Sequence, residues 1–252
     1  MRSYFRSGPA RNLGASPGFN EVRNYFDFRS VRLGAWVKAD EQRQRARDFF
    51  IALIDLQEIL QVPPWVISLR GQLSLHYGAG GQPGVAAHYM PAARVLALAK
   101  NAGAGSLAHE WFHAFDHYIA EFIFAEPVGA RFGSTAWLSD FQLKSHPLCH
   151  ALADCYSAVL LAPCGNEPSE LVSRSINYDK QQGSSYWSKP EELCARAFES
   201  FIEDAAIRNA FLASGTRVTK AGFDAYPRGT QRERINHCFQ IYFNQLGASL
   251  SA

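Results

Sequence analysis

The sequence has 252 residues, of which 47% are hydrophobic and 19% charged, a composition typical of a globular protein with a substantial core. Its formal net charge of +2 is too small to indicate nucleic-acid binding by itself. No stretch reaches the roughly 18 apolar residues of a membrane span, and no apolar segment follows the first basic residues as it would in a secretory signal. We therefore expect no membrane partner.

The five cysteines form an odd set without a C-x-x-C pair. This pattern favours free thiols over a disulfide framework, because disulfides are paired and persist in oxidising compartments. We therefore expect a cytoplasmic protein.

Residues 1–19 are predicted to be a flexible basic lead-in. Residues 7–19 are rich in Gly, Pro, Ser and Asn, and Arg2, Arg6 and Arg11 alternate with aromatic residues. Such an arm could contact nucleic acid, but a solvated surface segment explains the arginines more simply, and no nucleic-acid-binding motif accompanies them. We do not expect a nucleic-acid partner.

The next part of the chain is predicted to contain one helix and a small sheet. Apolar residues recur at helical spacing from residue 40 to 60, and Pro63 and Pro64 end that helix. Four runs with strand-like composition follow, separated by Gly- and Pro-rich turns. They cover residues 65–69, 73–77, 85–89 and 94–99.

The second half of the chain is predicted to be helical. One helix starts at the N-cap candidate Ser106, and others are expected at 147–161, from about residue 190, and at about 230–246. A helix, a small sheet and then several helices favour an α+β fold. Because no linker divides the chain, we expect a single domain over residues 20–252.

The segment GSLAHEWFHAFDHY, residues 105–118, contains an H-E-x-x-H motif at His109, Glu110 and His113. On a helix, positions i and i+4 lie about 40° apart around the axis and about 6 Å along it, so both imidazoles can bind one zinc ion. The glutamate between them can reach a water on the metal and act as general base. His117 is excluded as third ligand, because about 12 Å of helix rise separates it from the first histidine.

A carboxylate on another helix is a common third zinc ligand. In the helix near Pro190, Glu192 and Glu199 are seven residues apart and share one face, so both are candidates. Glu191 is assigned to a capping box with Ser188 and is therefore not available. Only one of the two candidates can reach the metal, because about 10 Å of helix rise separates them.

Asp116 lies on the same helical face as His109 and His113. Carboxylates around zinc sites often accept a hydrogen bond from a ligand imidazole, and Asp116 could do so. It could equally be a charge on the helix surface.

Several stretches of the sequence resemble known bacterial families. They are FRSVRLGAWVKADEQ, LSLHYGAGG, GVAAHY, GSLAHEWFHAFDHY and YWSKPEELCARAFESFIEDA. Together, over about residues 20–245, they resemble the CLCA_X family and the related first type of large polyvalent protein-associated domain. These families are zincin-like, so the resemblance implies a zincin-like α+β fold with a small mixed sheet packed on the H-E-x-x-H helix. For the polyvalent domain it also implies an association with mobile elements.

A second, partial resemblance concerns gluzincins of the lethal-factor toxin type. Their H-E-x-x-H-A-x-D and E-x-x-A-x-A-F motifs are similar to residues 109–116 and 192–198. The resemblance implies that Glu192 is the third ligand, and Glu199 would then bond to residues around the metal. The chain departs from the type at Arg196, where an acidic residue is usual, and in the 79 residues (192 − 113) between second and third ligand.

The leading hypothesis is a zinc-dependent metallopeptidase. Zinc held by His109, His113 and Glu192 would carry a water that Glu110 deprotonates for attack on a peptide carbonyl. Tyr186 could donate a hydrogen bond to the developing oxyanion, or it could simply pack against the neighbouring tryptophan. The run GVAAHY could pair with an extended peptide or protein substrate.

The alternative hypothesis keeps the zinc site and drops the chemistry. The protein would then be a catalytically silent, zinc-stabilised protein-binding module, which the polyvalent-domain resemblance would link to mobile-element or phage conflict. The glutamate of the H-E-x-x-H motif argues against this alternative, because a purely structural zinc site needs no base.

Overall fold

The computed structural model describes residues 4–13, 16–79, 87–99, 105–219 and 223–251. Its strands are β1 (Arg6–Ser7), β2 (Ser30–Leu33), β3 (Ser74–Tyr77), β4 (Ala87–Met90), β5 (Val95–Leu98) and β6 (Arg208–Asn209). A four-stranded sheet has the order β2-β3-β5-β4, and β1 pairs with β6 in a separate antiparallel ladder. Strands β2, β3 and β5 are parallel, and β4 runs antiparallel at the edge, so the sheet is mixed.

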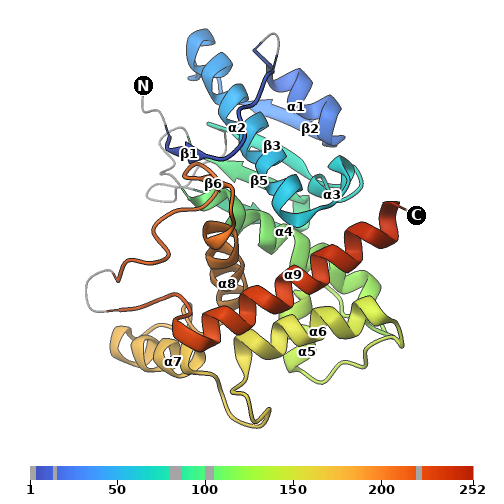
Figure 1. Ribbon diagram of the computed structural model, residues 1–252, viewed down its shortest axis with the longest axis vertical. Helices are drawn as coiled ribbons and strands as arrows, with labels where there is room; N and C mark the ends of the chain where they lie inside the picture. The colour runs from blue at the N-terminus through green and yellow to red at the C-terminus, as the bar shows by residue number, and fades with distance from the viewer. Residues whose placement is uncertain (1–3, 14–15, 80–86, 100–104, 220–222, 252) are drawn as a thin grey trace.

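The helices make up most of the rest. They are α1 (Phe19–Phe26), α2 (Ala39–Leu60), α3 (Pro64–Ile67), α4 (Ser106–Ile123), α5 (Gly133–Leu138), α6 (Pro147–Leu160), α7 (Glu170–Gln182), α8 (Pro190–Asp204) and α9 (Gly229–Ser251), with a 3-10 turn η1 (Pro91–Ala93). Figure 1 shows the sheet with α1, α2 and α3 at one end of the molecule and the remaining helices at the other. The fold is therefore α+β with a helical C-terminal half, as the sequence predicts.

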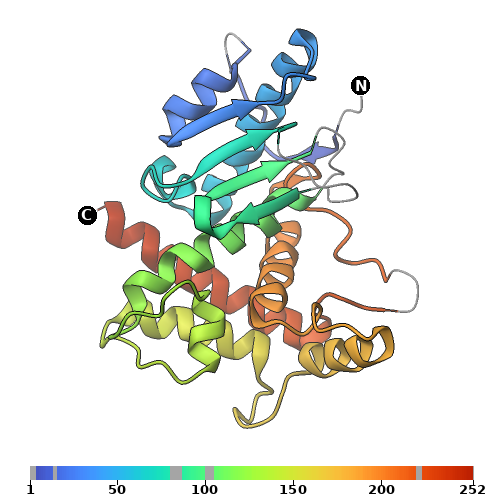
Figure 2. The same ribbon diagram turned by 180° about the vertical axis from the view of Figure 1, so that it is seen from behind.

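One face of the sheet packs against helices. Alternate residues of a strand point to opposite faces, and the inward set contains buried leucines and Tyr77. The Tyr77 ring lies 6.1 Å from Phe19 of α1 and 5.8 Å from Phe49 of α2, measured between ring centroids. Figure 2, turned by 180°, shows the opposite face with no described helix in front of it.

Helix α4 joins the sheet to the helical half. Trp111, Phe112 and Phe115 are fully buried, and Phe112 stacks on Phe198 of α8 at 4.8 Å between centroids. At helical spacing Trp111 and Phe115 lie on the side of α4 away from His109, and Phe112 lies about 60° around the helix from it. The same contacts that form the core therefore press α4 against α8 and fix the direction of the histidines.

The structure confirms the helix predicted at 40–60 and the strands predicted at 73–77 and 94–99. Of the strand predicted at 85–89, residues 85 and 86 lie outside the described residues and the remainder belongs to β4. The strand predicted at 65–69 is wrong, because α3 occupies this position. Pro64 fits the first turn of a helix, and this local preference prevails over the β-branched composition of the run.

The described part of the N-terminal lead-in is anchored to the domain. Arg6 and Arg11 both donate hydrogen bonds to the fully buried Asp55 of α2, and Arg11 also binds Glu58. Strand β1 adds backbone pairing with β6. The sequence predicts a solvated basic arm, but two of its arginines, Arg6 and Arg11, instead bind a buried carboxylate of the domain.

All five cysteines are free thiols in the structure. Among the described residues, no helix combines the length and the apolar character that crossing a membrane requires.

Candidate metal centre

The H-E-x-x-H segment lies near the start of α4. The helix begins at Ser106, but the cap position is taken by Gly105, whose positive φ of 99° is easier for glycine than for serine. The amide of Ala108 donates to the carbonyl of Leu212, which satisfies one of the free groups in the first turn. As a result the next residues, His109 and His113, project from a fixed helix end.

The two imidazoles meet. Nε2 of His109 and Nε2 of His113 are 3.1 Å apart, and the rings lie edge to face with centroids 4.8 Å apart. This arrangement follows from the i, i+4 spacing, and it turns both Nε2 atoms towards the same point.

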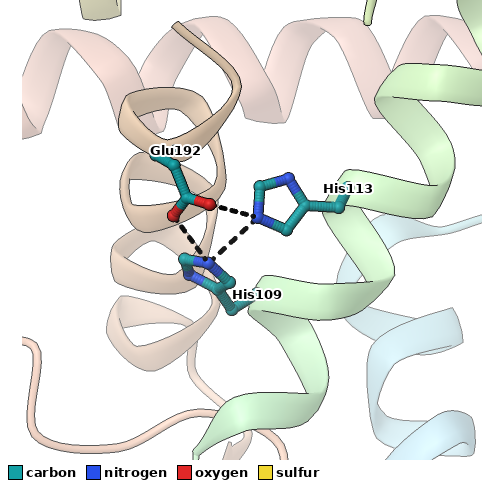
Figure 3. A group of neighbouring side chains, drawn as sticks. All are labelled: His109, His113 and Glu192. Carbon is teal, nitrogen blue, oxygen red and sulfur yellow. Dashed lines mark hydrogen bonds and ion pairs between the residues drawn. The ribbon is translucent and has the colours of Figure 1, made fainter. Parts of the chain in front are cut away.

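Glu192, in the first turn of α8, brings a carboxylate to that point. Its Oε2 lies 3.4 Å from Nε2 of His109, and its Oε1 lies 3.4 Å from Nε2 of His113. One ligand atom from each residue falls within 4.8 Å of the others (Figure 3). Two nitrogen atoms and one oxygen atom from two helices therefore surround a position that could hold a metal ion.

The geometry of the three residues suits a shared zinc ion better than direct hydrogen bonds between their side chains. The 3.4 Å contacts are longer than good hydrogen bonds, and Oε2 of Glu192 is buried with no hydrogen-bond partner among the described residues. A buried carboxylate oxygen without a partner is costly, and a divalent cation would satisfy it. Two imidazoles and one carboxylate are also an established catalytic zinc set, with the fourth position open.

The charges around the site favour a cation. Burial alone would lower the pKa of His109, but the carboxylates of Glu192 and Glu199 raise it to about 10. Burial would raise the pKa of Glu192, but His109 and His113 hold it well below its usual range. The protein thus keeps an ionised carboxylate here and stabilises positive charge beside it.

Glu199 and Tyr226 stand behind His109. Oε2 of Glu199 lies 3.5 Å from Nδ1 of His109, on the side of the ring away from the cluster, and it accepts a hydrogen bond of 3.1 Å from the hydroxyl of Tyr226. Glu199 is therefore placed to orient the His109 imidazole through Nδ1, whereas Glu192 lies at Nε2, the side that faces the metal position. Tyr226 was not found by sequence reasoning, because no local spacing connects it to either motif.

Asp116 does not serve the histidines. It is fully buried and accepts hydrogen bonds from the Ser134 amide (3.0 Å), the Ser134 hydroxyl (2.6 Å) and the Tyr156 hydroxyl (2.7 Å). Nδ1 of His113 has no hydrogen-bond partner in the described part of the chain. Asp116 instead fastens α5 and α6 to α4, so neither of the two roles that the sequence left open, a bond to a ligand imidazole or a charge on the helix surface, is found.

The predicted capping box at the start of α8 is also wrong. The amide and hydroxyl of Ser188 both donate to Asp179 of α7 at 2.7 Å, and Glu191 accepts from the Thr135 hydroxyl. Lys189 takes the cap position, and Pro190 occupies the first turn as expected. Ser188 and Glu191 bond to Asp179 and Thr135 instead of to each other. These bonds fix the helix end that carries Glu192.

Tyr186 lies at the rim of the site. The residue is 44% exposed and its ring contacts Trp187, but its hydroxyl interacts with Glu192. Burial of the hydroxyl and the charge of Glu192 both raise the pKa of Tyr186, so the phenol stays protonated and can donate. The two interpretations of this residue, packing and function, are compatible.

Two further charged groups border the cluster. Glu110 is half-buried, and its negative charge acts on both His109 and Tyr186. Arg196 is almost fully buried, lies over the Trp187 ring, and places Nη1 3.8 Å from Oε2 of Glu192. The candidate base, Glu110, thus lies on the same side of the cluster as Tyr186. Arg196 brings a positive charge to the position where gluzincins usually have an acidic residue.

His117 is turned away from the metal position. Its Nδ1 lies 2.9 Å from the hydroxyl of Tyr89 on β4, so it links the metal-bearing helix to the edge strand. The geometric argument that excluded it as a ligand agrees with this placement.

Comparison with known proteins gives one match. The family model of large polyvalent protein-associated domain 1 matches residues 178–250, a segment that runs from the end of α7 through α9. It supports the resemblance to that domain family over less than a third of the chain, including Glu192, Glu199 and Tyr226. No curated protein and no solved structure matched the chain.

Proposed function

We propose that the protein is a zinc-dependent metallopeptidase with a zincin-like fold of the gluzincin type. The observation that supports this most directly is the convergence of His109, His113 and Glu192 from two helices, with Glu110 beside them. A structural zinc site would close the fourth position with another residue, whereas a three-residue set leaves room for water and substrate.

Zinc bound by these three residues would supply a Lewis acid and a water that is easily deprotonated. Glu110 directly follows the ligand His109, and its negative charge acts on both His109 and Tyr186. It would accept the proton of the attacking water and return it to the leaving amine. Tyr186, protonated at neutral pH, can donate a hydrogen bond to the oxygen of the attacked carbonyl. Glu199 and Tyr226 hold the His109 ring in place during the reaction.

The edge strand suggests where the substrate binds. β4 is the last strand of its sheet and packs beside α4, to which the Tyr89–His117 hydrogen bond ties it. An extended peptide can add to a free sheet edge through backbone hydrogen bonds. A chain bound there would run alongside the helix that carries the zinc ligands.

The test compares wild type with Glu110→Gln, both loaded with one zinc per chain. Each is incubated with a mixture of denatured proteins, and new N-termini are counted by mass spectrometry. The variant keeps the size of the side chain but lacks the base, so cleavage should fall by about 10²–10⁴-fold or more while zinc content is unchanged. If fully loaded wild type releases no more N-termini than the variant, the zinc-stabilised binding module is the better description.

A further inference from the structure

The outward face of the four-stranded sheet carries a row of basic residues. Arg32 of β2 pairs in register with His76 of β3, His76 with Ala97 of β5, and Ala97 with His88 of β4. Register partners point to the same face of a sheet, so the arginine and the two histidines form one line across the strands. With about 4.8 Å between strands, the line is about 14 Å long.

This face is open. Its opposite side packs on helices through Tyr77 and its neighbours, so the row must point away from these helices. Figure 2 shows the sheet from the side opposite to Figure 1, with no described helix in front of it. Arg32 is exposed and both histidines are partly exposed, whereas Ala97 between them is buried beneath its neighbours. A small residue at the centre leaves the two imidazoles room to turn towards a ligand.

The arginines of this face lack the acidic partners that most other arginines of the chain have. Arg29, just before β2, donates to the Ser74 hydroxyl (3.0 Å) and to the Ala93 carbonyl, both uncharged. The side chain of Arg32 forms no ion pair or hydrogen bond with any residue that the structure describes. Elsewhere Arg6, Arg11 and Arg232 are neutralised by carboxylates.

The positive charges of this face affect one another. The pKa of His76 is lowered by burial and then by the charges of Arg32, Arg29 and His88. An anion placed on the row would relieve this repulsion and favour protonation of the histidines.

We propose that this face, defined by Arg29, Arg32, His76 and His88, binds the phosphate backbone of single-stranded nucleic acid. Arginine forks match phosphate geometry, and imidazole rings can stack on unpaired bases, which a duplex does not offer to a sheet. This surface replaces the N-terminal arm as the candidate, since Arg6 and Arg11 are engaged with Asp55 and Glu58. The inference is independent of the zinc site.

The experiment measures binding of a fluorescent oligothymidylate of about twelve nucleotides by anisotropy, at pH 8 and pH 5.5, over a series of salt concentrations. Two arginines predict a slope of log K against log salt of about −1.4 at pH 8, and the slope should become steeper at pH 5.5 because bound phosphate favours a protonated imidazole on this face. Arg32→Gln should flatten the slope by about 0.7, and so should Arg29→Gln. The matched control is Arg208→Gln, which removes an exposed arginine of β6 and should leave the slope unchanged.

Melting temperatures of the variants show that each is folded. The proposal is overturned if wild type does not bind at about 20 mM salt, if Arg208→Gln weakens binding as much as Arg32→Gln, or if the slope is the same at both pH values. Tighter binding of the corresponding duplex, or of polyglutamate, would assign the face to another class of partner and equally overturn it.

Discussion

Two carboxylates, Asp55 of α2 and Glu192 of α8, are both withdrawn from solvent but have very different surroundings. Asp55 is fully buried, and both its oxygens accept hydrogen bonds of 2.7–2.8 Å from Arg6, Arg11 and Asn209. Glu192 is only 9% exposed, yet its contacts to the two histidines are 3.4 Å long and one oxygen has no hydrogen bond to the described residues.

The difference separates a structural carboxylate from one prepared for a ligand. Around Asp55 the partners are permanent cations and an amide at ideal distances, so the group is complete and joins the N-terminal segment to the domain. Around Glu192 the two imidazoles lie at 3.4 Å and the Arg196 guanidinium at 3.8 Å, all longer than good hydrogen bonds, and a cation between the carboxylate and the imidazoles would improve the imidazole contacts. Burial is similar at the two positions, and what distinguishes them is how completely the carboxylate oxygens are hydrogen-bonded.

The largest expected effect is the loss of zinc affinity in Glu192→Ala. Structural zinc binding of about 10–16 kcal/mol, shared by three or four ligands, gives roughly 4 kcal/mol per ligand, or about 10³-fold in affinity. We expect this loss for Glu192→Ala, measured by competition with a chelating dye. Glu191→Gln, at the adjacent position and bonded to Thr135, should bind zinc as wild type does. Equal losses in both variants would mean that α8 merely tolerates substitution poorly.

In metal-free protein the comparison should reverse. Asp55→Asn leaves Arg6 without its carboxylate and Arg11 with Glu58 alone, and breaking such a buried pair costs about 3–5 kcal/mol of unfolding free energy. Glu192→Gln removes contacts of 3.4 Å to imidazoles that can lose their protons, so it should cost the chelator-treated protein less stability than Asp55→Asn does. Urea unfolding measures both, with Asp40→Asn, an exposed acid, as the control expected near zero. A large loss for Glu192→Gln would show that the cluster is complete without metal.

The sequence predicts the local part of this site well and the distant part poorly. His109, Glu110 and His113 are fixed by helical spacing alone, and the E-x-x-A-x-A-F resemblance points to Glu192. What could not be predicted depends on contacts between remote elements, such as the capture of Ser188 by Asp179. The polar donors that occupy Asp116 come from α5 and α6, and nothing in the local pattern around Asp116 indicates them.

The fold shows the same division. Helical periodicity identified α2, and short strand-like runs bounded by turn compositions identified β3 and β5. Strand β2 was missed because its outward residues, Ser30 and Arg32, are polar and exposed and its inward ones only partly buried, so its apolar signal is weak. Its pairing with β3 is what holds it in the sheet, and that pairing is a long-range property.

Glu199→Ala should have a smaller effect than loss of a ligand. The carboxylate contacts Nδ1 of His109 at 3.5 Å and does not face the metal position, so its removal loosens the ring without removing a donor. Loss of such outer partners typically costs about 10–100-fold in metal affinity. The same chelator competition measures it. An effect as large as that of Glu192→Ala would make Glu199 the ligand and contradict the assignment.

The smallest effect is expected for Tyr226→Phe. This change removes the hydroxyl that donates to Glu199 at 3.1 Å, and the carboxylate keeps its contact with His109, so zinc affinity should fall by no more than about tenfold, or about 1.4 kcal/mol. Tyr156→Phe is the matched control, since it removes a phenol that donates to another buried carboxylate, Asp116. That variant should lose stability in urea but keep its zinc affinity, because Asp116 does not touch a ligand. If the two variants lose zinc equally, the hydroxyl of Tyr226 acts only through general packing, and the chain of contacts from Tyr226 through Glu199 to His109 has no special role.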